Sequence, residues 1–499
     1  MFKSRQMKLS IPNDLVFAEL AATNAKLVSQ ALGFNDETAG EIEMAVEEVL
    51  SNIINNAFEP GREDIIDVVF DLKNTGLEIV MREKGMPRDP DLETEYSPEK
   101  VQQTWSGKGL GMYLAKRVMD GLSFHNLGKQ GRETRLFKFQ DQNKVDSILS
   151  GEELEKARAQ DRSQIHPRES VKYTVRRLRP EEAVEVSRCV YTAYGYTYLH
   201  EDMYYPDRVR YLNENGDLIS FVAVTDYGGV IAHAAMIIGD DPLVPEFGVA
   251  ATKPGFRGQG CLNALSEARI EEAMQRGFTG GFGMGVTSHF YSQKSMLKRG
   301  MKPCALLLSN AAEPEYKDMK KRDIQRESAV MQFKYLKAPG DVVVYPPQRH
   351  AEFVKRIYSN LGVGARLQEA GDYEGPSAPR SNMDVKTDAD RITADIRINE
   401  YGRDIVRETA SKLGFLGPDA VMTVYLYLPL SDPGTAVYCP ELEDLGFFFA
   451  GIKPGSKSDF LILQYLNGYE MDFEQIAVGC EFSGEIKEYV RKYAERSKN

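Results

Sequence analysis

Apolar residues recur along the chain with two different periods, and these periods predict a mixed α/β protein. Between residues 36 and 58 the spacing is three and four, which is typical of one face of a helix. Residues 217–226 and 229–240 are instead short apolar stretches bounded by turn residues, as in buried strands. The helical stripe consists of Val46, Leu50, Ile53, Ile54 and Ala57. We therefore expect an α/β multidomain protein.

Two stretches interrupt this pattern and divide the chain into three expected domains. Residues 146–170 are charged and poor in large apolar side chains, which predicts an exposed linker. The sequence KAPGD at residues 337–341 is a second break. A chain of 499 residues is expected to form about three domains. We place them at 1–145, 171–337 and 340–499.

The charge and cysteine content exclude several classes of protein. The 74 acidic residues outnumber the 62 Lys and Arg residues, giving a net charge of −12, and an acidic surface does not favour nucleic acid. Five scattered cysteines form no disulfide framework, which fits a reducing compartment. No run of about 18 apolar residues is present, and residues 1–14 lack the apolar core of a signal peptide. We expect a cytoplasmic protein with no nucleic-acid or membrane partner.

Glu48, Asn52 and Asn56 lie four residues apart in the first predicted helix, so their side chains are expected to line up. A solvated helix face is the simplest explanation of such a row. Asparagine is, however, a poor helix former, and amide oxygens that bind a hard cation such as Mg²⁺ would compensate for that cost. A metal-assisted site is therefore the alternative to a plain surface.

Two further segments of the first domain contain candidate ligand-binding residues. A strand-like stretch leads into residues 83–87, which read Glu-Lys-Gly-Met-Pro. Residues 107–111 read GKGLG and precede a predicted helix. Backbone N–H groups in such a loop favour a phosphate, although glycine clusters are more often plain turns.

Taken together, these segments resemble the nucleotide-binding boxes of the GHKL ATPases, particularly the anti-sigma factor serine kinases, over about residues 8–140. The resemblance implies a GHKL (Bergerat-type) α/β sandwich that binds ATP with Mg²⁺. Glu48 would be the base that activates a hydroxyl or water, and Asn52 the Mg²⁺ ligand. Glu83 replaces the family's adenine-reading aspartate, and Pro87 replaces a glycine. The other cofactor-binding residues would be Asn56, Gly85, Gly107, Lys108, Gly109, Leu110, Gly111 and Thr134.

In the second domain, a predicted strand runs into Pro254 and is followed by a glycine-containing loop and a helix over residues 261–276. Two glycines at such a turn expose backbone amides at a helix N-terminus, where an anion binds favourably. A plain strand-to-helix connection is the alternative. The loop residues are Arg257, Gly258, Gln259 and Gly260.

This loop resembles motif A of the GNAT acyltransferases, R-x-x-G-x-G/A, although Leu262 occupies the final small position. The resemblance implies acetyl-CoA as cofactor and transfer of its acyl group to an amine. Thr252 would lie on the strand that pairs with the pantetheine arm. His289 would stand in place of an asparagine of the family's last motif.

Glu246 and Tyr291 are the candidate catalytic residues of this second domain. An amine with a pKa of about 10.4 must lose a proton before it attacks. Glu246, at the start of the cofactor strand, is the candidate base. A solvent-facing residue at a strand end is the alternative for Glu246. Met296 stands where many family members have the tyrosine that protonates the leaving thiolate, so Tyr291 is the candidate substitute.

The third domain has strand and helix patterns but no R-x-x-G-x-G loop. Residues 445–452 resemble the end of a GNAT domain, so we expect a degenerate GNAT-like lobe without its own cofactor site. The three phenylalanines at 447–449 are expected in the core.

The leading hypothesis is a regulatory N-acetyltransferase fused to an ATP-binding, serine-kinase-like domain that would control it. The acceptor would be an amine, either a protein lysine or a small molecule. An alternative is an anti-sigma-type serine kinase or partner-switching regulator, which acts on an anti-sigma antagonist-like protein while the GNAT part only senses acyl-CoA. A scaffold in which both sites have decayed is the third hypothesis.

Overall fold

The computed structural model contains two large sheets, one in the first 140 residues and one through the rest of the chain. None of the helices formed by the described residues is long and apolar enough to cross a membrane. The structure describes residues 6–59, 61–87 except 74 and 75, 110–139, 171–196, 198–312, 325–389, 391–417 and 421–497.

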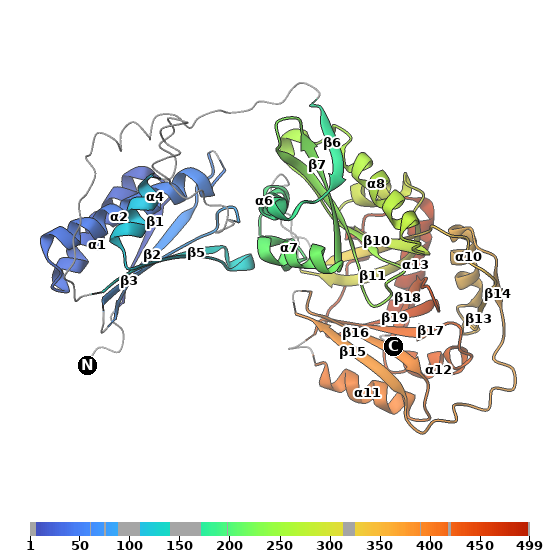
Figure 1. The fold of residues 1–499 in the computed structure, drawn as a ribbon. Coiled ribbons are helices and arrows are strands. Elements are labelled where there is room, and N and C mark those ends of the chain that lie inside the picture. The colour runs from blue at the N-terminus through green and yellow to red at the C-terminus, as the bar shows by residue number, and fades with distance from the viewer. Residues whose placement is uncertain are drawn as a thin grey trace.

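The first sheet is antiparallel throughout, in the order β1-β2-β3-β5-β4. Its strands are β1 (Gln6–Pro12), β2 (Ile65–Lys73), β3 (Gly76–Glu83), β4 (Gly121–Asn126) and β5 (Arg132–Phe139). Three helices cover one face, namely α1 (Leu15–Ala31), α2 (Asp36–Ala57) and α4 (Leu110–Val118) (Figure 1). The Asn35 side chain accepts a hydrogen bond from the N–H of Thr38 and caps α2.

The second sheet has β6 at one edge, and the first seven strands from that edge include β9, which leads into the predicted acyl loop. In sheet order these strands are β6 (Tyr173–Arg177), β7 (Leu218–Thr225), β8 (Val230–Ile237), β9 (Glu246–Thr252), β10 (Gly280–Val286), β12 (Glu327–Tyr335) and β11 (Lys302–Ala311). The associated helices are α6 (Ala183–Tyr194), α7 (Pro206–Asn215), α8 (Cys261–Gln275) and α9 (Tyr291–Leu297).

The same sheet continues from β11 into the C-terminal lobe. The remaining strands, in sheet order, are β18 (Phe448–Lys453), β19 (Phe460–Leu466), β17 (Thr423–Pro429), β16 (Thr393–Glu400) and β15 (Asn382–Asp388). The helices of this lobe are α10 (Ala351–Leu361), α11 (Ile405–Phe415), α12 (Gly434–Glu443) and α13 (Glu481–Arg496). A separate pair of short strands is formed by β13 (Val342–Val344) and β14 (Ala365–Leu367).

One apolar core crosses the proposed boundary near residue 340. It contains Leu306 and Val330 on one side of that boundary and Leu426 and Leu463 on the other, all nearly inaccessible to solvent. Phe447, Phe448 and Phe449 are buried in it, which confirms that prediction. The second and third proposed domains therefore share a sheet and a core.

The long sheet curves strongly, so that its C-terminal edge approaches the connection between β8 and β9 (Figure 1). Lys386 of β15 forms an ion pair with Asp240 in that connection. Ser456, in the turn after β18, donates to Asp241 from both its N–H (2.6 Å) and its hydroxyl (2.7 Å). These contacts bring residues of β16 and β18 close to the start of β9.

Candidate functional site

The row of side chains on α2 lies next to the first turn of α4. Glu48 and Asn52 are half-buried, and Asn56 is exposed and donates to the carbonyl of Asn52 at 3.1 Å. The Glu48 carboxylate lies so close to Gly111 that a Cβ atom at that position would collide with it. A side chain at Gly111 would therefore have to displace the Glu48 carboxylate. Gly107, Lys108 and Gly109 of the predicted phosphate loop lie outside the described residues, and Leu110 begins α4.

The carboxylate of Glu83, at the end of β3, accepts hydrogen bonds from within the protein. Its Oε1 atom accepts from the Nε–H of Arg132, and its Oε2 atom accepts from the N–H of Gly85. The residue is only 4% exposed. The sequence suggested an adenine-binding carboxylate, and Arg132, 49 positions away, was not identified. Each carboxylate oxygen of Glu83 therefore already has a partner within the protein. Thr134, also predicted near the phosphates, is buried in β5 between Met81 and Phe124.

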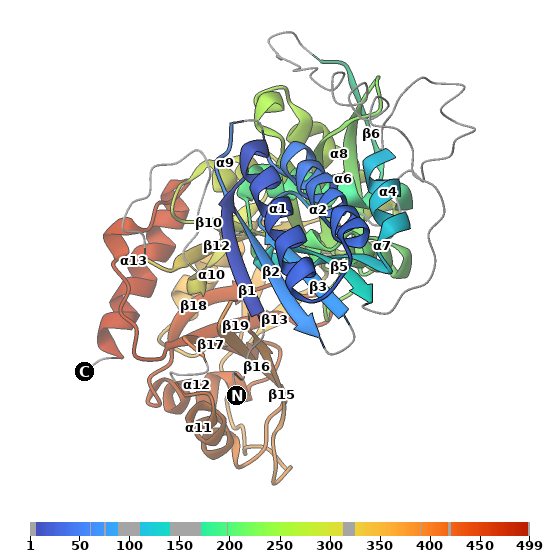
Figure 2. The same ribbon diagram turned by 90° about the vertical axis from the view of Figure 1, so that its left-hand side faces the viewer.

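The loop after Glu83 is hydrogen-bonded to the second domain. The hydroxyl of Tyr191 donates to the carbonyl of Lys84 at 2.9 Å, and the hydroxyl of Tyr196 donates to the carbonyl of Gly85. Arg188 of the same helix α6 donates to the carbonyl of Pro87 at 3.3 Å. Figure 2 looks onto the first domain, with α6 and α7 behind it.

In the second domain, β9 and β10 are parallel neighbours that separate after one pair, Glu246 with Phe282. The separation has a backbone cause, because Val249 adopts a φ of 49° inside β9. His233 Nδ1 bonds to the carbonyl of Val249 (2.9 Å), and the hydroxyl of Tyr194 donates to the carbonyl of Ala250 (2.8 Å). These carbonyls are thus directed away from β10, and the two strands diverge.

The predicted acyl loop lies at the C-terminal end of β9. Gly258 and Gly260 both have φ of 83°, a conformation that favours glycine. In the described part of the protein, the backbone N–H groups of residues 258–262 have no acceptor, as expected at a helix N-terminus. The segment before β6 holds the loop in place, because the Gln259 side chain accepts a hydrogen bond from the N–H of Val171 at 3.1 Å. Arg257 is exposed at its rim.

These features fit the pyrophosphate and pantetheine parts of coenzyme A. Backbone amides without an acceptor among the described residues favour an anion at the start of α8. The hydroxyl of Thr252, at the end of β9, is buried and has no hydrogen-bond partner among the described residues. A ligand that extends between β9 and β10 would therefore meet both donors and an unsatisfied polar atom.

His289 and Tyr291 lie beyond β10, near the start of α9. His289 Nδ1 accepts from the N–H of Tyr291 at 3.3 Å, and burial lowers the pKa of His289. Tyr291 is 68% exposed. Met296 packs over Gly283 and Gly285 of β10, where added Cβ atoms would collide with its side chain. The thioether therefore fills the position where the resemblance implies a tyrosine.

The third lobe contributes side chains near Glu246 that the sequence did not identify. The Nζ atom of Lys453 lies 4.7 Å from the ring centre of Phe282, the residue paired with Glu246. Arg397 lies over the ring of Phe460 at 4.8 Å, and Phe460 pairs with Lys453. Asp395 is two residues before Arg397 on the same strand and interacts electrostatically with Lys453. We call the group of side chains formed by Glu246, Phe282, Asp395, Arg397 and Lys453 the inter-lobe recess.

The third lobe has no equivalent of the opening between β9 and β10. Its parallel pair, β16 and β17, stays hydrogen-bonded over five consecutive residue pairs. Beyond β16, a Cβ atom at Gly402 would collide with the backbone of Arg380 and Ser381. The Asp404 carboxylate at the start of α11 accepts from the N–H (2.7 Å) and hydroxyl (2.9 Å) of Ser381. A carboxylate and a chain segment thus occupy the place where an anion would bind.

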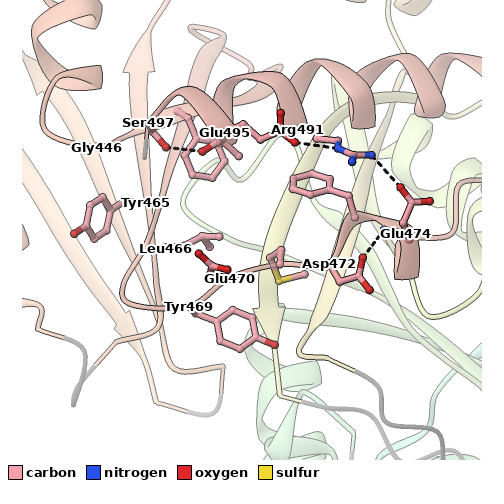
Figure 3. Close-up of a pocket in the computed structure, with 14 residues that line it drawn as sticks. Gly446, Tyr465, Leu466, Tyr469, Glu470, Asp472, Glu474, Arg491, Glu495 and Ser497 are labelled. Atoms are coloured by element: carbon pink, nitrogen blue, oxygen red, sulfur yellow. Dashed lines mark hydrogen bonds and ion pairs between the residues drawn. The ribbon is translucent and has the colours of Figure 1, made fainter. Parts of the chain in front are cut away.

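A cavity of about 360 Å³ lies elsewhere in the third lobe, between α13 and the end of β19 (Figure 3). Aromatic and acidic side chains line it, including Tyr469 and Glu470. Its arginine, Arg491, is already paired with Glu474 (2.9 Å) and Glu495 (3.2 Å). This cavity is separate from the β9–β10 opening.

Comparison with known proteins assigns a class to the first part of the chain. Residues 12–138 match the family model of the histidine kinase-like ATPase domain. Among curated proteins, this part is similar to the serine-protein kinase RsbW of Oceanobacillus iheyensis, with 23% identity over 124 residues, which are 24% of this chain and 78% of the relative. RsbW of Bacillus subtilis is 20% identical over 144 residues, which are 28% of this chain and 89% of the relative.

Among solved structures, the chain is similar to N-acetyltransferases. An N-acetyltransferase from Staphylococcus aureus Mu50 is 16% identical and covers 33% of this chain and 99% of its own, with a TM-score of 0.28. The ribosomal-protein-S18-alanine N-acetyltransferase from Escherichia coli is also 16% identical and covers 34% of this chain and 97% of its own, with a TM-score of 0.28. The features of this chain that indicate an acyl site are the divergence of β9 from β10 and the glycine loop before α8.

Proposed function

We propose that residues 171–337 transfer an acetyl group from acetyl-CoA to an amine. The observation that supports this most directly is the separation of β9 from β10 beside the unoccupied amides of residues 258–262. Bound acetyl-CoA would supply the acyl group and a thiolate leaving group. Arg257 and the loop amides would hold the pyrophosphate, and Thr252 the pantetheine strand.

Side chains of the protein would accept the proton of the amine and donate a proton to the leaving thiolate. Glu246, half-buried at the start of β9, would receive a proton from the acceptor amine, directly or through water. Tyr291 is the candidate donor to the leaving thiolate, and His289 would orient the chain at the start of α9 through its bond to the Tyr291 N–H. Met296 cannot donate a proton.

We propose that the first domain regulates this transfer. The loop that carries Tyr196, bonded to Gly85 of the first domain, continues to Tyr198 and His200, which interact electrostatically with Glu246. A change in the loop after Glu83 would therefore reach the acceptor side of the acyl site. Equal acetyl-transfer rates with and without saturating ATP would contradict control by this nucleotide.

A serine-kinase activity of the first domain is the second candidate function. It is favoured by the alignment of Glu48, Asn52 and Asn56 on α2 and by the similarity to proteins named serine-protein kinases. Glu48 would activate the acceptor hydroxyl, and Asn52 would bind Mg²⁺. Phosphorylation of an anti-sigma antagonist-like protein, lost in Glu48→Ala, would support this function.

Thermal-shift titrations with acetyl-CoA and, separately, with ATP and Mg²⁺ test both sites. A ligand at 100 times its Kd stabilises the folded state by about 2.7 kcal/mol. We expect a shift with acetyl-CoA that Gly260→Asp abolishes and that Gly228→Asp retains. Gly228 is the matched control, because it has a similar φ of 89° and no neighbour within 4 Å. A protein that acetyl-CoA does not stabilise would contradict the acetyltransferase function.

For the first domain, Asn52→Ala is the corresponding variant. A shift with ATP and Mg²⁺ that this variant loses would support a working nucleotide site. Acetyl-CoA stabilisation alone would favour an acetyltransferase whose first domain acts through contact with α6.

A further inference from the structure

The inter-lobe recess holds charges of both signs that come from different parts of the sheet. Glu246 comes from β9, whereas Asp395, Arg397 and Lys453 come from the third lobe. On β16, Asp395 and Arg397 alternate with Ala394, Ile396 and Ile398, which are in the apolar core. The two charged side chains therefore point to the opposite face of the sheet, toward the recess.

These charges are not neutralised by direct contacts within the protein. Among the described residues, the side chains of Glu246, Asp395, Arg397 and Lys453 form no hydrogen bond or ion pair. Their counterparts at the rim are paired, as Lys386 is with Asp240 and as Arg391 is with Asp388 at 3.4 Å. The Nζ atom of Lys453 lies 4.7 Å from the ring centre of Phe282 and 5.7 Å from that of Tyr427.

Lys453 and Asp395 differ in their exposure to solvent. Burial lowers the pKa of Lys453. Asp395 is exposed to solvent, whereas Lys453 is half-buried. Asp395 acts on Lys453 electrostatically but forms no ion pair with it among the described residues, so a bound anion would give Lys453 a direct, charge-assisted contact.

We infer that the acceptor is an amine that also carries an anionic group, bound with its anion at Lys453 and Arg397 and its amine at Glu246. This inference rests on the proposed acetyl transfer and assigns the third lobe the role of acceptor recognition. Phe282 contacts Lys453 through its ring and pairs with Glu246 along the strands, so the two ends of one small zwitterion would meet opposite charges. A polyamine, which lacks an anion, would leave Lys453 and Arg397 without a direct partner.

The anionic group of the acceptor could be a carboxylate or a phosphate, because both bind to lysine and arginine. Amines that carry one or the other group distinguish the two. Calorimetric titration of the full chain, saturated with coenzyme A, is carried out with a panel of amino acids, with the carboxamides of the same amino acids and with aminoalkyl phosphates. We expect binding of at least one anionic class and at least about tenfold weaker binding of the neutral matched amine. Binding by the amino acids identifies a carboxylate, and binding by the aminoalkyl phosphates identifies a phosphate.

Lys453→Gln is expected to weaken binding of the anionic amine about tenfold while the carboxamide binds as before. Lys457→Gln is the matched control, because Lys457 is an exposed lysine four residues later. Transfer rates with the best acceptor should show the same change in KM. A folding defect is excluded if Lys453→Gln retains the thermal shift with coenzyme A.

Equal binding of an amino acid and its carboxamide, or binding of diamines alone, would overturn the inference. If coenzyme A still binds in that case, the acetyltransferase proposal is not affected. Unchanged affinity in Lys453→Gln would also overturn it. If coenzyme A does not bind, the proposed function fails. Anion-dependent binding of the amines, lost in Lys453→Gln, would then still support the recess as a site.

Discussion

Arg132 on β5 donates its Nε–H to Glu83 on β3, and the two residues are only 8% and 4% exposed. A buried carboxylate is tolerated when a cation and a backbone N–H satisfy its oxygens. The Arg132–Glu83 pair thus fixes the end of β3, and with it the loop that contacts α6. The carboxylate that resembles an adenine reader has a structural role in this fold.

Glu83→Gln is expected to lower the free energy of unfolding of the first domain by about 3–5 kcal/mol, because Arg132 would remain as a buried, uncompensated charge. Chemical denaturation of the full chain measures the loss. The control is Arg82→Gln, which removes a 54% exposed partner of Glu133 and should cost less than about 1 kcal/mol. Equal small effects of both substitutions would contradict a buried ion pair.

The local elements could be predicted from the sequence because their signals are local. The helical stripe and the Asn35 cap define α2, and the glycine loop before residue 261 defines the start of α8. In contrast, Arg132 and Lys453 belong to no motif. Their roles depend on Glu83 and Phe282, which are distant in the sequence and are brought near only by strand pairing and sheet curvature. Such partners cannot be identified from periodicity or spacing.

His233 is expected to make the folded state sensitive to acid. It is fully buried, and burial lowers its pKa to about 3. Between pH 6.5 and 3 the unfolded chain takes up a proton that the folded chain does not, so stability is lost as the pH falls. At pH 5 the loss from this residue is about 2 kcal/mol.

The measurement is the free energy of unfolding between pH 7.5 and 5 in wild type and in His233→Asn. The asparagine retains a donor for the Val249 carbonyl and does not titrate, so its profile should be flatter below pH 6.5. His125→Asn, at an exposed histidine, is the control and should follow wild type. Parallel profiles for wild type and His233→Asn would show that the buried imidazole does not govern this slope.

The contact between the first domain and α6 is expected to couple the thermal unfolding of the first domain to that of the second domain. Tyr191 and Tyr196 each donate to a carbonyl of the loop after Glu83. Replacing both by Phe leaves the carbonyls without donors and should cost about 1 kcal/mol per bond. We expect calorimetry to show the first domain unfolding at lower temperature than the remainder in Tyr191→Phe/Tyr196→Phe. Tyr227→Phe, at a 61% exposed tyrosine, should change nothing. An unaltered transition in the double variant would mean that other contacts hold the domains together.

Gly451 is expected to be essential where the two halves of the long sheet join. It pairs with Ala305 across β18 and β11, at a φ of 146°. A Cβ atom there would collide with the backbone of Cys304 and Ala305, so Gly451→Ala must either separate the strands or strain both. We expect a loss of about 2–4 kcal/mol in unfolding free energy, measured by denaturant titration. Gly414→Ala is the matched control in the same lobe, since Gly414 lies in α11 with open space around it and should tolerate or slightly favour alanine. A small effect at both positions would mean that β11 and β18 can part without cost, and that the sheet is not continuous in solution.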